Sequence, residues 1–171
     1  LLSNWAFLPD SVKLYYAIKV IVLGTESTGK TTLTERLARH FSCSYVLETA
    51  RDIIGDSNTF TLEDLSLVVQ EHAKHIEKAV VGDSPLVIID TDVHTTLSYA
   101  QFRFGKKLEI SDDVLAINNA SIYLYLKNDV AYKQDGTRLT EQDSQLLDIS
   151  HRKVLSDYNI QVTEVSGDWE E

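Results

Sequence analysis

The apolar run IKVIVL (18–23), followed at once by GTESTGKTT (24–32), constrains the fold more than any other part of the sequence. A short, β-branched run that meets a glycine is typical of a buried parallel strand entering a turn. Apolar residues recur at helical spacing in TTLTERLARHF (31–41), so a helix is predicted to follow the turn. A strand, a glycine-containing loop and a helix therefore form one continuous unit.

Residues 24–31 match the pattern G-x-x-x-x-G-K-[ST] at every position. In such a loop the glycines let the backbone wrap around phosphate oxygens, and the backbone N–H groups point at the anion. Lys30 is expected to place its charge on the outer phosphates, and the Thr31 hydroxyl to ligate Mg²⁺. A chance glycine-rich turn is the alternative, but the flanking strand and helix favour a nucleoside triphosphate site. The residues expected to hold the nucleotide are Gly24, Glu26, Ser27, Thr28, Gly29, Lys30, Thr31 and Thr32.

Glu26 is unusual because it places an acid inside a loop that binds anions. Such an acid is unfavourable unless it faces away from the phosphates, or holds a metal-bound water or a basic partner. A solvent-facing loop residue and a functional carboxylate are both open interpretations at this point.

Strand and helix candidates alternate along the rest of the chain. The helix at 62–80 has Thr61 as its expected N-cap and Asp64 in the capping-box position. The alternation predicts an α/β fold: a P-loop NTPase/kinase-like three-layer sandwich with a parallel sheet of about five strands, ordered 2-3-1-4-5 by analogy with small-molecule kinases. We expect a single domain over 1–171, with 1–17 as a lead-in that carries aromatic anchors. The other strands are expected at 44–48, 86–90, 121–126 and 160–165, and the other helices at 94–104, 112–120 and 141–158.

The chain of 171 residues has a formal net charge of −10. An acidic surface repels nucleic acid and anionic lipid, so neither is an expected partner, and a phosphate ligand must be captured locally. The single cysteine, Cys43, and the lack of an apolar run long enough to cross a bilayer predict a cytoplasmic protein. The sequence does not begin with Met, which suggests a fragment of a longer protein. It contains no Met at all, which raises the alternative that modified methionines were omitted from it.

The run LVIID (86–90) puts Asp90 at the carboxyl end of a buried strand, with Asp92 just beyond it. This is the position of a carboxylate that holds Mg²⁺, directly or through water. Asp92 has an alternative role as the cap of the helix that starts near His94. His94 is expected to be a helix-start residue, because no partner His or Cys lies at ligand spacing.

Other P-loop classes fit the sequence less well than a kinase does. A guanine-nucleotide switch needs N-K-x-D, whereas residues 126–129 read LKND and begin with a leucine that cannot bind the base. The switch also needs D-x-x-G after the strand, where this chain has DTDV (90–93). A motor ATPase would add a further domain, for which 171 residues leave little room.

A small-molecule kinase needs an acceptor pocket, a carboxylate that positions the hydroxyl, and arginines that close over the transferring phosphoryl group. Glu48 and Arg51 follow the second strand, and parallel sheets bind ligands at the carboxyl ends of their strands. The polar segment KQDGTRLTEQD (133–143), with Gly136 as a hinge and Arg138 in the middle, is typical of a closing lid. A surface turn around Glu48 and an ordinary exposed loop at 133–143 are the alternatives.

Together these motifs resemble the ribosylnicotinamide kinase domain of the bifunctional nicotinamide-nucleotide adenylyltransferase/ribosylnicotinamide kinase (NadR-type) family. The resemblance covers nearly all of the chain, and the lead-in is similar to that family's junction with an upstream adenylyltransferase domain. The motifs that carry it are GTESTGKTTL (24–33), ETARD (48–52), IDTD followed by TT (89–96), and QDGTR (134–138).

The resemblance implies that the γ-phosphate of ATP is transferred to the 5′-hydroxyl of a nucleoside, nicotinamide riboside. It implies that Lys30 and Thr31 serve ATP and Mg²⁺, that Asp90 helps to hold the metal, and that Arg138 is the lid arginine. The carboxylate that orients the hydroxyl is expected to be Asp92, then Glu48. The residues expected to be catalytic are Lys30, Glu48, Asp92 and Arg138, and those expected to bind the substrate are Glu48, Arg51, Asp92 and Tyr99.

The sequence departs from this family at the aromatic side chains that clamp the nicotinamide ring. Trp5 and Trp169 lie near the ends of the chain and match no clamp position, so Phe60, Tyr99 and Phe104 are the candidates. Two other functions stay open. A regulatory module would bind nucleotide without a small-molecule acceptor and would have a shallow or filled pocket beside Glu48. A degenerate P-loop scaffold would have lost residues such as Lys30 and Asp90, which are intact here.

Overall fold

The computed structural model describes the backbone of residues 2–167 and the side chains of residues 4–167, so Trp169 lies outside the described residues. Its centre is a five-stranded parallel sheet with the order β2-β3-β1-β4-β5, which confirms the predicted order. The strands are β1 (Ile18–Leu23), β2 (Ser44–Val46), β3 (Leu86–Asp90), β4 (Ile122–Leu126) and β5 (Thr163–Val165).

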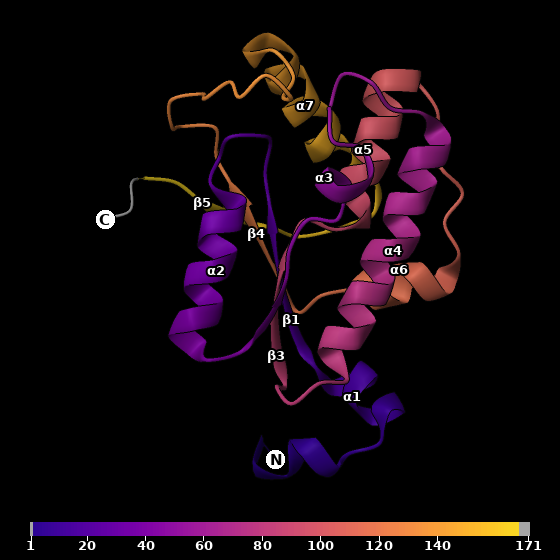
Figure 1. Cartoon of the computed structure of the whole chain (residues 1–171), viewed down its shortest axis with the longest axis vertical. Helices are drawn as coiled ribbons and strands as arrows, with labels where there is room; N and C mark the ends of the chain where they lie inside the picture. Colours follow the sequence, from indigo (N-terminus) through magenta and orange to yellow (C-terminus); the bar gives the residue numbers. More distant parts are fainter. Residues whose placement is uncertain (1, 168–171) are drawn as a thin grey trace.

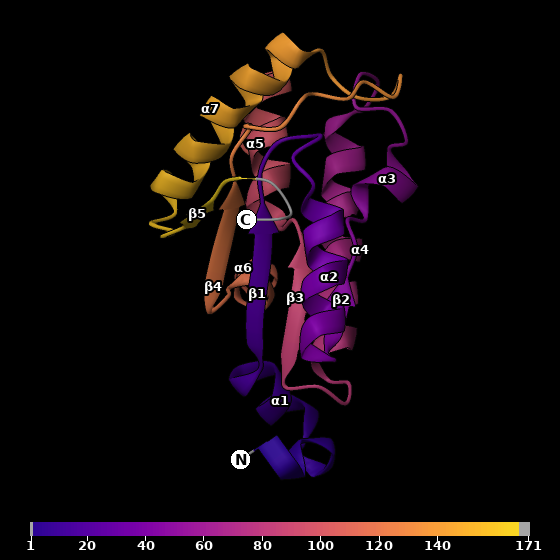
Figure 2. The same ribbon diagram turned by 90° about the vertical axis from the view of Figure 1, so that its left-hand side faces the viewer.

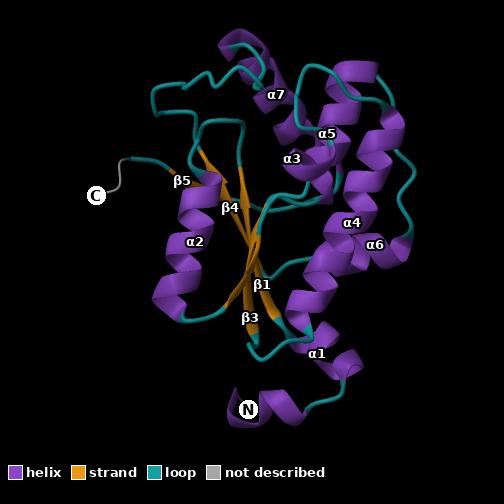
Figure 3. Ribbon diagram, viewed as in Figure 1, coloured by secondary structure: helices purple, strands orange, loops and turns teal. Residues whose placement is uncertain are grey.

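Helices cover both faces of the sheet, as Figure 3 shows by colour. In Figure 1, α2 lies on one side of the strands, and α4, α5 and α6 lie on the other. Figure 2 shows α7 beside α5, above β4. This is the predicted three-layer sandwich. The helices that build these layers are α2 (Lys30–Phe41), α4 (Leu62–Val80), α5 (Val93–Phe104), α6 (Asp112–Asn118) and α7 (Glu141–Asp157).

Alternating side chains of the central strands contribute to two hydrophobic clusters, one on each face of the sheet. Val20 and Val22 pack with Ala38 of α2 on one face. On the other face Ile21 and Leu23 pack in a larger cluster that reaches α4 and α7. Because both faces of β1 are buried, this strand is apolar at nearly every position. Its apolar run therefore predicts a buried strand from the sequence alone.

Capping residues define where the long helices begin. Thr61 and Asp64 form the predicted capping box of α4, with the Thr61 Oγ1 accepting a hydrogen bond from the Asp64 N–H. The Thr140 side chain accepts from the Asp143 N–H at the start of α7. Among the described residues, no helix is both long and apolar enough to cross a membrane.

Several boundaries differ from the prediction. The segments predicted as strands at 44–48 and 160–165 are regular only over β2 and β5, because both are short edge strands paired on one side. A one-turn helix that was not predicted, α3 (Ala50–Ile53), follows β2. The lead-in contains a 3₁₀ helix, η1 (Leu2–Phe7), and α1 (Asp10–Tyr16).

The lead-in packs against the end of the sheet opposite the P-loop (Figure 1). Trp5 is buried in the same cluster as Val80, and its Nε1 donates a hydrogen bond to the Gly82 carbonyl at 3.1 Å. The Lys13 Nζ donates to the Val81 carbonyl at 2.9 Å. These contacts tie the lead-in to the C-terminal end of α4, so Trp5 is a structural anchor of the domain.

Trp5→Ala is expected to lower the free energy of unfolding by about 3–5 kcal/mol, because it leaves a cavity and removes a buried hydrogen bond. Trp5→Phe keeps most of the apolar contact and should lower it by only about 1–2 kcal/mol. Phe7→Ala is the control, since the Phe7 side chain is 87% exposed. Urea titrations measure all three. Equal stability of Trp5→Ala and Phe7→Ala would contradict the anchoring role.

Candidate active site

The predicted site residues meet at one edge of the sheet. The P-loop follows β1, Glu48 follows β2, Asp90 ends β3, and the segment before Arg138 leaves β4. In a parallel sheet all these strand ends point the same way. In Figure 1 the loops that leave β1 and β4 lie together at the top, with the predicted lid above the P-loop.

The P-loop conformation depends on its two glycines. Gly24 has φ 138°, and a Cβ atom there would lie 2.8 Å from the Leu126 carbonyl oxygen. Gly29 has φ 89° and caps the N-terminus of α2 in the left-handed conformation. Inside the loop the buried Thr28 hydroxyl donates to the Thr25 carbonyl at 2.9 Å. The loop is therefore a closed turn, and a side chain at position 24 or 29 would distort it.

The polar groups at the start of α2 connect the loop to β3. The Lys30 Nζ donates to the Thr25 carbonyl at 2.8 Å, across the mouth of the loop. The Thr31 hydroxyl donates to Asp90 Oδ2 at 2.6 Å. Thr32 is exposed on the first turn of α2. Lys30 and Thr31 thus occupy the positions that the motif predicts for them.

Asp90 is suited to hold a divalent cation together with Thr31. Its side chain is fully buried, and its Oδ1 has no hydrogen-bond partner among the described residues. Burial raises the pKa of the Asp90 carboxyl to about 6, and the nearby Lys30 charge opposes this rise. The carboxylate is therefore ionised at neutral pH with one oxygen left over, which fits Mg²⁺, an ion that takes one or two protein oxygens beside phosphates and water.

Asp92 caps helix α5, one of the two roles that the sequence left open. Its Oδ1 accepts from the backbone N–H groups of His94 and Thr95 at 3.0 and 3.2 Å. Its Oδ2 lies 2.5 Å from His94 Nδ1, and both side chains are buried. Thr91 adopts φ 66°, a strained conformation for a β-branched residue, and so turns the chain sharply between the two aspartates.

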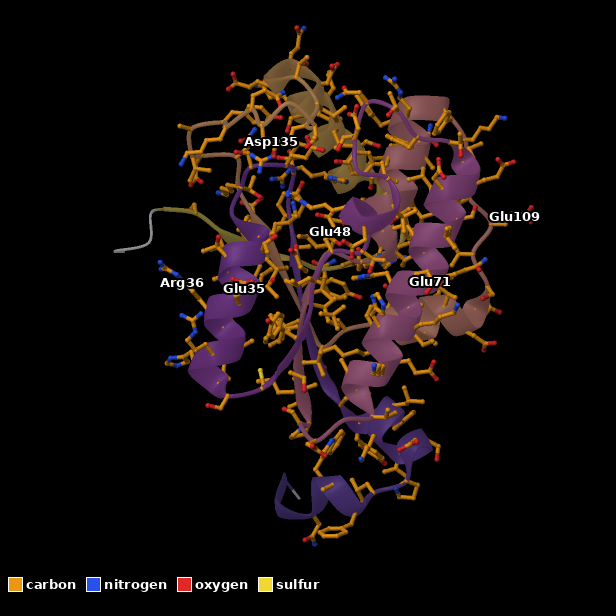
Figure 4. All side chains as sticks on the ribbon, in the orientation of Figure 1. Glu35, Arg36, Glu48, Glu71, Glu109 and Asp135 are labelled. Carbon is orange, nitrogen blue, oxygen red and sulfur yellow. The ribbon has the colours of Figure 1, made fainter. Side chains whose placement is uncertain are left out.

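A pocket of about 160 Å³ opens beside the P-loop. Glu48 lies at its wall, and among the described residues its one ion-pair partner is Arg51, whose Nε is 3.6 Å from Glu48 Oε2. The Arg51 side chain is 61% exposed, so this ion pair is weak. In Figure 4 Glu48 is at the centre of the molecule, between α2 and α4. The residues that line the pocket include Lys30, Glu48, Arg51, Phe60, Asp92, Thr95, Tyr99, Arg138 and His151.

Residues 127–140 connect β4 to α7 as an irregular segment that reaches the P-loop, and we call this segment the lid. Arg138 lines the pocket, and its Nε lies 2.9 Å from Asp135 Oδ2. The Lys133 N–H donates to the Ser27 side chain of the P-loop at 2.9 Å. Figure 4 places Asp135 above the phosphate side of the site. The predicted lid arginine thus lines the same pocket as Lys30 of the P-loop, while its guanidinium binds Asp135 and the Lys133 carbonyl within the lid.

Glu26 does not simply face solvent. Its two carboxylate oxygens accept hydrogen bonds from Ser57, Tyr99 and the Leu139 backbone N–H. Burial raises the pKa of the Tyr99 phenol well above its usual value, and the Glu26 charge adds to this rise. Tyr99 therefore stays protonated as a donor to Glu26.

The candidate aromatic side chains form a cluster at the pocket. Phe60 lines it, and its ring meets Tyr99 and Phe104 edge to face, with centroids 6.0 and 5.6 Å apart. Trp5 lies at the opposite end of the sheet, in the anchor described above. Phe60 and Tyr99 thus present two adjoining aromatic rings at the wall of the pocket.

Sequence reasoning missed the histidines behind the pocket. His151 of α7 is buried, lines the pocket, and has no hydrogen-bond partner for either ring nitrogen among the described residues. The Thr49 hydroxyl lies 2.9 Å from His72 Nδ1 and 3.1 Å from His75 Nδ1. A histidine inside an amphipathic helix gives no signal of this kind, because only the tertiary packing of α7 and α4 brings these rings to the site.

Fold and site together define a P-loop α/β protein. The family described as AAA domain matches residues 19–171, and the chain belongs to this family. The trifunctional NAD biosynthesis/regulator protein NadR of Salmonella typhimurium, like that of Escherichia coli, is 28% identical over 139 residues, which is 78% of this chain. This similarity confirms the resemblance to NadR-type proteins that the motifs indicated, and it agrees with the prediction of a kinase. The chain spans 34% of the length of these relatives.

Solved structures show the same fold. A NadR protein in complex with NR has a TM-score of 0.79 at 21% identity, over 99% of this chain and 51% of that one. The thymidylate kinase of Ehrlichia chaffeensis has a TM-score of 0.63 at 14% identity, over 89% of this chain and 88% of that one. These likenesses confirm the predicted P-loop α/β architecture.

Acid should destabilise the protein partly through His151. Burial, and then the Lys30 charge, lower the pKa of its imidazole to about 3, whereas the unfolded chain has the usual value of about 6.5. Between these values the unfolded state binds the proton and the folded state does not. The free energy of unfolding should therefore fall as pH decreases, by up to about 1.4 kcal/mol per pH unit from this group.

His151→Gln is expected to flatten that slope between about pH 6.5 and pH 4, since glutamine does not titrate. Urea unfolding at a series of pH values measures it, with His40→Gln on the exposed face of α2 as the control. Burial also lowers the pKa of His72, so part of the slope should remain. An unchanged slope in His151→Gln would show that His151 is protonated in the folded protein.

Proposed function

We propose that this chain is an ATP- and Mg²⁺-dependent kinase that phosphorylates the 5′-hydroxyl of a nucleoside, with nicotinamide riboside as the acceptor. The observation that carries the proposal is the open pocket beside the P-loop, lined by a lightly paired carboxylate, Glu48, and by the lid arginine, Arg138. A nucleotide-binding module without an acceptor would have no need of such a pocket.

The P-loop and the lid would bind the phosphates of ATP and stabilise the transferring phosphoryl group. Lys30 leaves the Thr25 carbonyl and places its ammonium group on the outer phosphate oxygens. Thr31 and Asp90 would hold Mg²⁺, which when bound neutralises charge on the phosphates. Arg138, which lines the pocket from the lid, stabilises the charge that develops on the transferring group.

The contacts change the order of the two candidate carboxylates. Each oxygen of Asp92 already contacts a group of α5, so this side chain has little capacity left for an acceptor hydroxyl. In the part of the chain that the structure describes, Glu48 has one ion pair, the long one with Arg51. We therefore assign the positioning of the 5′-hydroxyl to Glu48 first, and assign Asp92 the task of supporting the pocket wall.

Nicotinamide riboside is favoured by the relatives. A NadR protein of the same fold carries NR, and another carries NAD and AMP-PNP. In this chain Phe60, Tyr99 and Arg51 would line the base and ribose, and Phe60 supplies an aromatic face in place of a tryptophan. We also propose that the parent protein carries an adenylyltransferase domain upstream and works in the cytoplasm.

The wild-type protein is expected to transfer phosphate from ATP to nicotinamide riboside in the presence of Mg²⁺, and Lys30→Ala to lower kcat/KM by at least about 10³-fold. A coupled assay with a panel of nucleosides measures this. Lys74→Ala, on the exposed face of α4, is the control for loss of a lysine. Nucleotide binding without transfer to any nucleoside would overturn the kinase proposal and favour a regulatory module.

Glu48→Gln is expected to lower kcat by about 10²- to 10⁴-fold with a small change in the KM for ATP, because it removes the carboxylate next to the acceptor hydroxyl. Glu109→Gln, far from the pocket at the edge of Figure 4, is the matched control. Steady-state kinetics with varied acceptor separate the two effects. A larger loss of kcat in Asp92→Asn than in Glu48→Gln, with both variants folded, would show that Asp92 and not Glu48 positions the acceptor hydroxyl.

A further inference from the structure

We propose that Glu26 is a positioning residue that fixes the lid and one wall of the acceptor pocket to the P-loop. The structural part of this inference stands on the contacts of Glu26, while its consequence for phosphoryl transfer rests on the proposed kinase function. Glu26 thereby explains why an acid is found inside a loop that binds anions.

The carboxylate of Glu26 joins three separate segments of the chain. Its Oε1 accepts from the Ser57 hydroxyl at 2.6 Å and from the Tyr99 hydroxyl at 2.9 Å. Its Oε2 accepts from the Leu139 backbone N–H at 2.8 Å. Ser57 lies between α3 and α4, Tyr99 lies on α5, and Leu139 lies near the end of the lid. A carboxylate accepts three such bonds well, because each donor meets a full negative charge.

Other contacts join the same segments, so Glu26 sits at the centre of a wider closure. The Ser57 N–H donates to the Thr137 carbonyl of the lid at 2.9 Å, and the Asn58 side-chain amide donates to the Arg138 carbonyl at 3.2 Å. The Ser27 side chain, next to Glu26, accepts from the Lys133 N–H. The lid is therefore held on both sides, by the P-loop and by the segment before α4.

The hydrogen bond from the Leu139 N–H to Glu26 also restricts the backbone of Arg138, because this N–H belongs to the peptide group that joins Arg138 to Leu139. The Leu139 side chain is only 2% exposed, and its carbonyl accepts from the Tyr132 hydroxyl at 2.6 Å. With both backbone groups of Leu139 engaged, the preceding residue has little freedom. Glu26 thus fixes the backbone next to the lid arginine, whose guanidinium is held within the lid by Asp135 and the Lys133 carbonyl.

The same carboxylate also reaches the acceptor pocket. Glu26, Ser57, Tyr99 and Arg138 all line it, and the Tyr99 ring contacts Phe60 edge to face. An acceptor that enters the pocket therefore meets the side chains that hold the lid. A lid that closes correctly only when this wall is in place would exclude water from the transferring phosphoryl group.

Glu26→Gln tests the inference because it keeps the size of the side chain but replaces one acceptor oxygen with an NH₂ group. The amide keeps one acceptor oxygen, so it can no longer accept from the Leu139 N–H on one side and from the two hydroxyls on the other, and the negative charge that all three donors meet is lost. The first readout is hydrogen exchange of the lid amides with AMP-PNP and Mg²⁺ bound and no acceptor present. We expect exchange at Leu139 to be about 10- to 100-fold faster than in the wild type, as for the loss of a hydrogen bond to a charged group.

Glu35→Gln is the matched control, since Glu35 lies on the exposed outer side of α2 (Figure 4) and should leave lid exchange unchanged. Tyr99→Phe and Ser57→Ala each remove one donor to Oε1 and keep the Leu139 bond, so each should have a smaller effect. These two variants also test the inference if Glu26→Gln fails to fold, because each should still speed lid exchange above the Glu35→Gln level.

The second readout is the partition of ATP between the acceptor and water. We expect Glu26→Gln to lower kcat for the acceptor by about 10- to 100-fold, to change the KM for ATP less than about twofold, and to raise the fraction of ATP that is hydrolysed. Lid exchange in Glu26→Gln equal to that in Glu35→Gln would overturn the inference, whatever the activity. If lid exchange is faster in Glu26→Gln but the wild type phosphorylates no nucleoside, the positioning role of Glu26 is supported. That result contradicts only the kinase proposal.

Discussion

The parallel pairing of β1 with β3 is the constraint on which the site depends. Val22 pairs with Asp90 in this register, so the P-loop begins beside the aspartate that ends β3. The short hydrogen bond from Thr31 to Asp90 follows from that register. A slip of one residue would turn the Asp90 side chain to the opposite face of the sheet and separate the two groups. The buried apolar faces of both strands therefore hold Thr31 and Asp90 together, in addition to forming the core.

Because the net charge is −10, the binding of a phosphate anion depends on the groups close to the site. The protein as a whole repels phosphate, and the anion must be attracted by the loop amides, Lys30 and Arg138. Glu26 would add to the repulsion if its charge faced the loop cavity. Its three hydrogen bonds to Ser57, Tyr99 and Leu139 direct the charge toward other donors, so the acid organises the site instead of opposing it.

Sequence reasoning predicted the strands, the P-loop and Asp90 because each has a local pattern: apolar runs, two glycines with a lysine, and a carboxylate after a buried run. The strand order was predicted by analogy with small-molecule kinases, and the structure confirms it. It predicted both roles of Asp92 without choosing between them, and the cap of α5 appears in the structure. It did not predict the partners of Glu26, since Ser57, Tyr99 and Leu139 lie 31 to 113 positions away. Contacts across such separations depend on tertiary packing, and a single sequence carries no pattern for them.

The unpaired buried atoms show how the site differs from the rest of the core. Asp90 Oδ1, Thr25 Oγ1 and both ring nitrogens of His151 have no hydrogen-bond partner among the described residues, and neither do Thr34 Oγ1 on α2 and Ser144 Oγ on α7. Each such atom costs about 1–3 kcal/mol in a folded protein. A domain that only had to be stable would have apolar or paired side chains at these positions. Thr25 belongs to the P-loop, Asp90 ends the strand beside it and His151 lines the pocket, so a bound ligand would be placed to satisfy these atoms, which cost stability when none is bound.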